Sequence, residues 1–205
     1  MSTLFGGKFF DHLMRMEPLV GATFFAKGSS TMLYEKDGRL YRLTQEGCGH
    51  ALLSLESSSG NPNFTKVVRD FGPVAPSDEG DDEFYWLAEV EWLEPLDPSG
   101  QQSMILADLL VSVTGDEELV MSEELPEFVG ACEQAMAQGH EYSNLLQALI
   151  VSAKFAATHD AAADVKLSNI MVRPRDGELV LVDPIAGNYF QLTGAQQEAM
   201  AEFFR

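Results

Sequence analysis

Two neighbouring stretches decide the fold of this chain: DVKLSNIMV, residues 164–172, and ELVLVDP, residues 178–184. Each contains a short apolar run, and the Asp176-Gly177 pair between them is a turn signal. A hairpin formed by the two runs would fold Asp183 back beside Asn169. The sequence therefore predicts a small cluster of polar side chains at the open end of this hairpin.

The residue types in this cluster are those of a phosphoryl-transfer site. Asp164 would address the hydroxyl group that accepts the phosphoryl, and Lys166 would lie near the transferred group and offset its charge. Asn169 and Asp183 supply oxygen atoms suited to Mg²⁺, which binds few protein ligands together with water and substrate phosphates. Asp and Asn also close turns and cap helices, but the hairpin and the final Asp at the expected distance favour the functional interpretation.

At these residues the chain resembles the protein kinase superfamily, and most of all the early protein kinases of T7-like bacteriophages, with a short N-I-M strand and D-P in place of D-F-G. The resemblance is specific over residues 164–184 and weaker over 28–96. It implies an α+β fold of the compact, atypical, bilobal protein kinase-like type. The antiparallel-sheet N-lobe would span residues 1–94 and the mainly helical, truncated C-lobe residues 95–205, with ATP and Mg²⁺ in the cleft.

The resemblance also implies nucleotide-binding positions in the first half of the chain. Gly28-Ser29-Ser30 lies where kinases have a glycine-rich loop, although an ordinary hairpin turn explains the single glycine equally well. Arg42 stands where the pattern has a phosphate-binding Lys, an exchange that is not conservative; the alternative is an exposed Arg on an edge strand. Glu56 or Glu46 would orient this cation. Trp92 occupies the hinge position that receives the purine, unless it belongs to an inter-lobe core.

Departures from the kinase pattern keep three functions open. Ala162 and Ala163 replace the usual His and Arg before Asp164, and little chain follows Asp183 for an activation segment, so peptide binding should differ or be absent. The leading interpretation is a serine/threonine protein kinase acting on host proteins or on itself. The second is a kinase-fold pseudoenzyme or acidic inhibitor, and the third a small-molecule phosphotransferase that shares the Asp–Asn–Asp scheme.

The charge of the chain is unusual: 32 acidic residues against 13 basic ones give a formal net charge of −19 at pH 7. Such a surface repels nucleic acid and anionic membranes and attracts basic proteins. We therefore expect a basic or nucleic-acid-binding host protein as partner, with mimicry of a DNA backbone as one mode of binding; the alternative is that the charges are simply dispersed. The acids gather at residues 78–83 and 116–127.

Several features indicate a cytoplasmic protein, in the host cytoplasm if a phage encodes it. Hydrophobic residues make up 45% of its 205 residues, enough for a core without disulfides. Cys48 and Cys132 are too few for a disulfide framework and lie in no metal-ligand cluster. No apolar run approaches the ~20 residues of a membrane span, and the N-terminus does not resemble a signal peptide.

Along the chain, predicted strands precede predicted helices, which is the order expected of an α+β fold. The Asp37-Gly38 pair predicts a hairpin into a strand at 40–43. Residues 73–82 are expected to form an acidic loop, and 95–100 a linker. The remaining elements are expected as strands at 24–26, 31–34 and 84–93 and as helices at 3–20, 50–56, 104–113, 123–138, 141–158 and 194–204.

Overall fold

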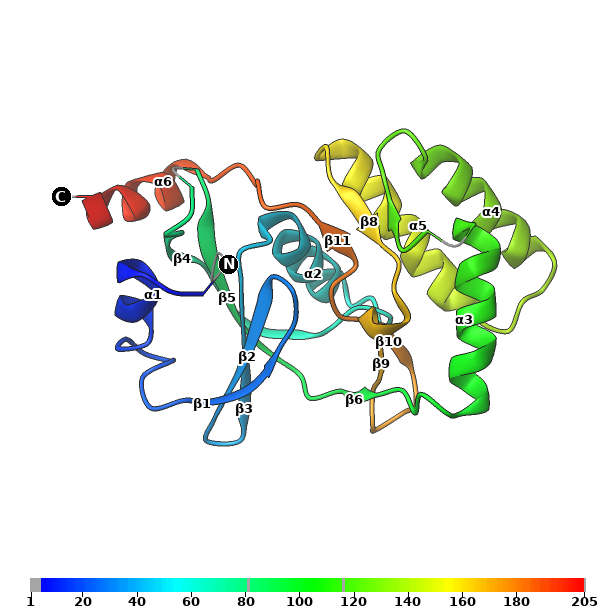
Figure 1. Cartoon of the computed structure of the whole chain (residues 1–205), viewed down its shortest axis with the longest axis horizontal. Coiled ribbons are helices and arrows are strands. Elements are labelled where there is room, and N and C mark those ends of the chain that lie inside the picture. Colours follow the sequence, from blue (N-terminus) through cyan, green and yellow to red (C-terminus); the bar gives the residue numbers. More distant parts are fainter. Residues whose placement is uncertain (1–4, 81, 116, 205) are drawn as a thin grey trace. The chain divides into compact units, whose positions relative to one another are not determined.

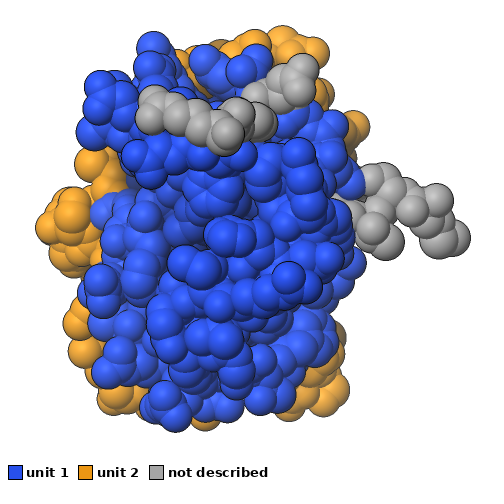
Figure 2. All heavy atoms as spheres, turned by 90° about the vertical axis from the view of Figure 1, so that its left-hand side faces the viewer, with its two compact units in different colours: residues 1–54, 67–91, 188–205 blue, residues 55–66, 92–187 orange. Residues whose placement is uncertain are grey.

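A computed structural model describes residues 5–80, 82–115 and 117–204 (Figure 1). Asp81 and Asp116, which belong to the two acidic clusters, lie outside the described residues. The chain divides into two compact units, coloured separately in Figure 2. Unit 1 comprises Met1–Ser54, Val67–Glu91 and Asn188–Arg205, and unit 2 comprises Leu55–Lys66 and Trp92–Gly187. The functional division into lobes 1–94 and 95–205 stays a prediction.

Unit 1 is built on a five-stranded antiparallel sheet of order β1-β2-β3-β5-β4. Its strands are β1 (Thr23–Lys27), β2 (Thr31–Lys36), β3 (Arg39–Thr44), β4 (Val67–Pro76) and β5 (Phe84–Val90). Asp37 and Gly38 join β2 to β3 with φ of 54° and 76°, the paired positive values that a two-residue hairpin turn requires. The predicted hairpin is confirmed. The expected loop at 73–82 is wrong in its first part, because β4 pairs with β5 as far as Pro76.

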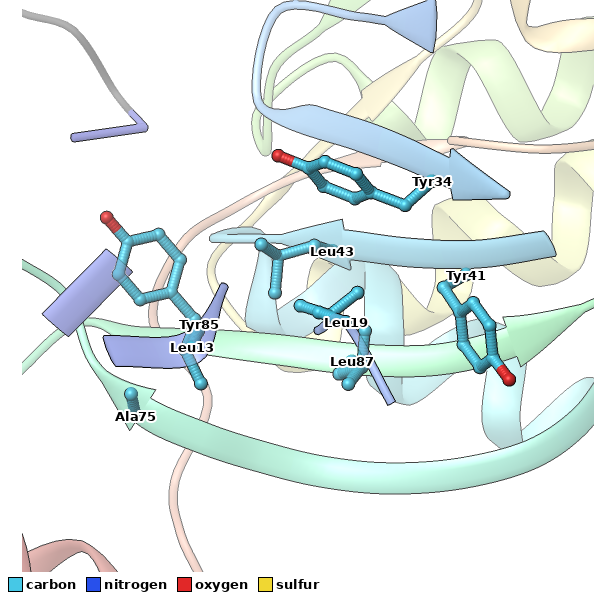
Figure 3. Close-up of a cluster of buried hydrophobic side chains, with 8 residues drawn as sticks. All are labelled: Leu13, Leu19, Tyr34, Tyr41, Leu43, Ala75, Tyr85 and Leu87. Atoms are coloured by element: carbon cyan, nitrogen blue, oxygen red, sulfur yellow. The ribbon is translucent and has the colours of Figure 1, made fainter. Parts of the chain in front are cut away.

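One face of this sheet carries an apolar cluster of eight buried residues (Figure 3), namely Leu13, Leu19, Tyr34, Tyr41, Leu43, Ala75, Tyr85 and Leu87. Successive strand residues point to opposite faces, so Tyr41 and Leu43 of β3 enter this cluster and Arg42 does not. Helix α1 (Lys8–Leu13) adds Leu13 to it. This helix is much shorter than the predicted 3–20. The Asp78 carboxylate accepts hydrogen bonds from the first backbone N–H groups of the helix, and thereby marks its start.

Helix α2 (Gly47–Ser59) begins earlier than the sequence predicted. A Cβ atom at Gly47 would lie 2.9 Å from the Asn188 carbonyl oxygen and from the Phe190 Cβ, so only glycine fits this close approach. The same segment accepts a hydrogen bond from the Cys48 thiol through the Tyr189 carbonyl, at 2.8 Å. The chain then ends with α6 (Gly194–Ala201), begun by a Thr193 capping box, and the short helix η2 (Glu202–Phe204).

Asp70 of β4 ties this strand to α2. His50 Nε2 lies 2.9 Å from its Oδ1, Ser54 donates to its Oδ2 at 2.7 Å, and the Gly72 N–H donates to its Oδ1 at 2.7 Å. Burial by itself raises the pKa of Asp70, but the hydrogen bond and charge of His50, with those from Ser54 and Gly72, lower the pKa to about 2. His50 is buried and contacts the Trp86 ring. Asp70 is thus held as a carboxylate.

Unit 2 is mainly helical. Its helices α3 (Gln101–Thr114), α4 (Leu125–Ala137) and α5 (Ser143–Thr158) confirm the three helices predicted over 104–158. One small sheet has the order β10-β9-β6, and the other β11-β8-β7. Their strands are β6 (Glu94–Pro95), β7 (Leu119–Val120), β8 (Ala162–Asp164), β9 (Ile170–Val172), β10 (Leu179–Leu181) and β11 (Ile185–Ala186). The expected linker at 95–100 therefore starts inside a strand, β6, which pairs with β9.

The segment 55–66 is anchored in unit 2 by Arg173, which follows β9. Its buried guanidinium donates to the Pro62 carbonyl at 2.8 Å and to the Phe64 carbonyl at 3.3 Å. The Thr65 N–H donates to the Leu181 carbonyl of β10. Together the elements confirm the predicted α+β class, with an antiparallel sheet in one unit and mainly helices in the other. No helix within the described residues is long and apolar enough to cross a membrane.

Candidate active site

Backbone hydrogen bonds bring the two ends of the predicted motif together in unit 2. The β9–β10 hairpin forms with Val180 opposite Met171. The Val182 N–H donates to the Asn169 carbonyl at 3.0 Å, and the Asp164 N–H donates to the Pro184 carbonyl at 2.9 Å. The segment before the hairpin therefore lies beside the segment after it, as the spacing of the motif predicted.

The Asn169 side chain closes this arrangement. It ends the single turn η1 (Leu167–Asn169), and its Nδ2 donates to the carbonyl oxygens of Asp164, at 3.2 Å, and of Asp183, at 2.8 Å. With the amide nitrogen engaged, the amide oxygen is the atom that remains for a cation. One amide oxygen and the Asp183 carboxylate suit Mg²⁺, which completes its shell with water and phosphate oxygens. No closed cage of three or more His, Cys, Asp or Glu side chains occurs among the described residues.

Asp164 and Lys166 form an ion pair at the end of β8. The Lys166 Nζ lies 3.0 Å from each oxygen of the carboxylate, whose side chain is 15% exposed against 34% for Lys166. Burial raises the pKa of Asp164, and the nearby charge of Asp183 adds to this, while the hydrogen bonds and charge from Lys166 and the Asn169 amide oppose it. The result is a carboxylate with a raised proton affinity, the property expected of a proton acceptor.

The missing His and Arg before Asp164 are replaced by strand pairing. Ala162 and Ala163 are buried in β8 and lie opposite Ala186 and Ile185 of β11, and β7 pairs with the other edge of β8. Backbone pairing on both edges of β8 thus supports Asp164 without polar side chains before it. The sequence offered no signal for this sheet, since β7 and β11 have two residues each and show no periodicity.

The predicted phosphate loop of unit 1 is anchored through Ser30. Its hydroxyl donates to Glu46, and its carbonyl accepts from the Thr44 hydroxyl at 2.9 Å and from the Gln45 N–H at 3.2 Å. Gly28 and Ser29 are exposed at the tip of the loop, whereas Ser30 is buried. The loop therefore presents its tip, while the Ser30 side chain is engaged with the protein.

Arg42 is buried, with 4% of its surface exposed, and it lies on β3 between β2 and β5. The alternative of an exposed Arg on an edge strand is therefore wrong. Its strand neighbours are Leu33 of β2 and Ala88 of β5, which belong with Leu40 to a second apolar cluster. Sequence reasoning missed this apolar surface beside the guanidinium, because β5 joins β3 only after some forty residues of intervening chain.

The remaining predicted residues are distributed over both units. Glu46 precedes α2 in unit 1, while Glu56, in unit 2, accepts a hydrogen bond from the Asn61 amide at 2.8 Å. Trp92, also in unit 2, is 40% exposed. The structure thus brings Asp164, Lys166, Asn169 and Asp183 together within unit 2. The roles of all these residues in binding or catalysis stay predictions.

No protein-family model and no curated protein matches the sequence. Among solved structures, the chain is similar to choline kinase LicA from Streptococcus pneumoniae, with a TM-score of 0.35 and 12% identity over 95% of this chain and 80% of that one. It is also similar to LicA in complex with AMP, with a TM-score of 0.32 and 13% identity over 90% and 72% of the two chains. Both similarities are low, so the function has to be inferred from the side chains of the site.

Proposed function

We propose that this chain is an atypical, phage-type serine/threonine protein kinase that transfers the γ-phosphoryl group of ATP to host proteins or to itself. The observation that carries the proposal is the Asn169 side chain, which binds the backbone carbonyls of both Asp164 and Asp183. It supports a site in which a proton acceptor and two metal ligands are held at one point of the fold.

The four polar side chains of the candidate site would have different tasks. Asp164 orients the acceptor hydroxyl and takes its proton as the oxygen attacks phosphorus, and its raised pKa favours that transfer. Lys166 shields the charge of Asp164 beforehand and of the phosphoryl group during transfer. Asn169 and Asp183 would hold Mg²⁺, which neutralises charge on the nucleotide phosphates.

Nucleotide binding is proposed for the Arg42 face of the sheet in unit 1. A guanidinium beside the apolar surface of Leu33, Leu40 and Ala88 offers contacts for both a phosphate and a base. The backbone of Gly28 and Ser29 would approach the phosphates, because the Ser30 hydroxyl is already engaged. Glu46, in the same unit, would orient Arg42; the roles of Glu56 and Trp92, which belong to unit 2, stay predictions.

A second function, capture of a basic host protein without phosphoryl transfer, is favoured by the charge of −19 and by Arg in place of Lys. Cytoplasmic action on a basic or nucleic-acid-binding partner is part of both proposals. A small-molecule hydroxyl is the third candidate acceptor, because it would need the same Asp–Asn–Asp set.

Labelled ATP and Mg²⁺ provide the test, with the protein alone, with host cell proteins and with a panel of small alcohols as acceptors. Label on protein in the wild type but not in Asp164→Asn supports the kinase, and label only on an alcohol supports the small-molecule enzyme. The exposed Asp108→Asn is the matched control. If no acceptor is labelled, the enzyme proposal is wrong.

Thermal unfolding with ATP and Mg²⁺ then separates a nucleotide-binding pseudoenzyme from a chain that binds no nucleotide. In the same assay Arg42→Lys should keep the stabilisation by ATP and Arg42→Ala should lose it. Stabilisation by ATP that stays equal to that of the wild type in both variants would show that another cation binds the phosphates.

A further inference from the structure

A long stretch of this chain contains acidic residues and no basic ones. No Lys or Arg occurs between Asp70 and Ala153, a stretch that includes α3, α4 and the start of α5. Every described acidic side chain between residues 92 and 153 is exposed, and none forms an ion pair within the described part of the chain. These residues are Glu94, Asp97, Asp108, Glu117, Glu118, Glu123, Glu124, Glu127, Glu133 and Glu141.

Within this region, the end of α3, strand β7 and the start of α4 enclose a groove of about 300 Å³. Helices α3 and α4 pack together in unit 2, in the green part of Figure 1. The floor of the groove is apolar and consists of Val113, Val120 and Phe128. Most of the surface of each of these three side chains is buried within unit 2, and each side chain lines the groove.

Three carboxylates line the same groove, from Glu117, Glu124 and Glu127. Glu124 accepts a hydrogen bond from the Met121 N–H at 2.9 Å, so part of its role is to hold the turn before α4. Glu127 lies in the first turn of α4, where a negative charge stabilises a helix. Neither the Glu117 nor the Glu127 carboxylate forms a hydrogen bond or ion pair with another described residue. Helix stabilisation therefore explains the position of Glu127. It does not explain Glu117 or the presence of an apolar floor beside these carboxylates.

We propose that this groove, the α3–α4 groove, binds a basic segment of a partner protein. One apolar side chain of the partner would contact Val113, Val120 and Phe128, and lysines or arginines on either side of it would pair with Glu117 and Glu127. The volume is at the small end of ligand pockets, ~300–1,000 Å³, which suits an anchoring side chain. The carboxylates of the groove repel the phosphates of ATP and of nucleic acid. The same carboxylates attract a basic chain.

The carboxylates of Glu117, Glu124 and Glu127 surround the apolar floor of the α3–α4 groove, and a partner side chain would remove the remaining exposed surface of that floor from water. An apolar centre with charged residues around it is the usual arrangement of a protein interface. This binding surface does not depend on phosphoryl transfer, and it would serve a kinase or an inhibitor.

The probe is a fluorescent peptide, KKALFAKK, which contains no hydroxyl group and so cannot accept a phosphoryl. Fluorescence anisotropy should show that Glu117→Gln with Glu127→Gln weakens binding about tenfold, through loss of two ion pairs. The matched control is Glu133→Gln with Glu141→Gln, two exposed acids that do not line the groove. It should change the affinity less than about twofold, because distant exposed charges are screened.

Peptide variants test the anchor without any change to the protein. KKAAAAKK keeps the charge and QQALFAQQ keeps the apolar pair, and both should bind at least about tenfold more weakly than KKALFAKK. Equal weakening by the two glutamate pairs, or equal affinity of KKALFAKK and KKAAAAKK, would overturn the proposal in favour of diffuse charge attraction. Asp164→Asn should bind the peptide like the wild type, and a loss there would place the peptide at the candidate active site instead.

Discussion

Two carboxylates, Asp70 in unit 1 and the less exposed Asp164 in unit 2, each lie beside a basic side chain, yet their pKa values are shifted in opposite directions. Asp70 accepts three hydrogen bonds from His50, Ser54 and Gly72, and its pKa falls to about 2. Burial raises the pKa of Asp164, the nearby charge of Asp183 adds to the rise, and the opposing ion pair with Lys166 does not cancel it. The first arrangement stabilises the fold, whereas the second raises the proton affinity of a carboxylate at the expense of stability.

The largest difference between the two carboxylates should appear in activity. Asp164→Asn should lower phosphoryl transfer at least about a hundredfold, since it removes the proton acceptor. Asp70→Asn should leave transfer by the folded protein within about twofold of the wild type, because Asp70 has no part in the proposed chemistry. Label incorporation from ATP measures both, at a temperature where each variant is folded. Comparable losses in the two variants would mean that Asp164 has no special chemical role.

Asn169→Ala tests how much the Asn169 amide, which binds the backbone carbonyls of Asp164 and Asp183, stabilises the fold. The carbonyls of Asp164 and Asp183 each lose a hydrogen-bond donor. This loss should lower the free energy of unfolding by about 1–3 kcal/mol and the Tm by roughly 3–10 °C. Calorimetry gives the Tm. Asn144→Ala, an exposed change on α5, is the control and should leave the Tm unchanged. A Tm equal to that of the wild type would show that strand pairing alone positions the site.

Asp70→Asn should destabilise the protein by about 1 kcal/mol near neutral pH, a value reduced for the exposure of this side chain. The lowered pKa means that the stabilisation is present above the ordinary carboxyl pKa and is lost as the pH falls toward about 2. Urea unfolding should therefore give free energies of unfolding for the wild type and for Asp70→Asn that converge as the pH falls through this range. A difference between the two proteins that does not change with pH would show that the stabilisation does not depend on ionisation of Asp70.

The smallest expected effect is a slight gain in the free energy of unfolding, in Asp164→Asn, where Asp70→Asn shows a loss. Because the pKa of Asp164 is raised, the folded state binds its proton more tightly than the unfolded chain, and stability falls as the pH rises through that window. Asp164→Asn cannot ionise, so it avoids this loss of stability and should be slightly more stable than the wild type at neutral pH. The difference in stability between variant and wild type should shrink below the ordinary carboxyl pKa. Urea unfolding of the same variant used for activity measures it, and a less stable variant would contradict the cause given for the shift.

The cluster at the candidate site could be predicted because its residues are close in the sequence. A turn at Asp176-Gly177 and two apolar runs are enough to place Asp183 beside Asn169. Elements that depend on distant segments could not be predicted in this way. The sheet that supports Asp164 pairs residues 119–120 with 163–164, and the position of β3 in the sheet interior depends on β5, which changes Arg42 from an exposed to a buried residue.

The first residues of helices α1 and α2 are fixed by single contacts, which the spacing of apolar residues in the sequence does not reveal. The start of α1 is set by the Asp78 carboxylate, far away in the chain, and that of α2 by the close approach of Asn188 to Gly47. Asp78 was also expected to belong to an acidic patch for partners. Its engagement with α1 means that variants which neutralise residues 78–83 should retain Asp78, so that folding and partner binding are tested separately.

The course of the chain has a practical consequence for dissecting this protein. The chain passes between the two units at residues 54–55, 66–67, 91–92 and 187–188, so neither unit is one continuous piece. A fragment that ends near residue 94 would lack the segment of Asn188 that covers Gly47. A fragment that starts there would leave the buried Arg173 without the carbonyls of Pro62 and Phe64. Each unit therefore needs residues from both halves of the chain, so a nick near residue 94 that keeps both halves should be tolerated better than removal of either half.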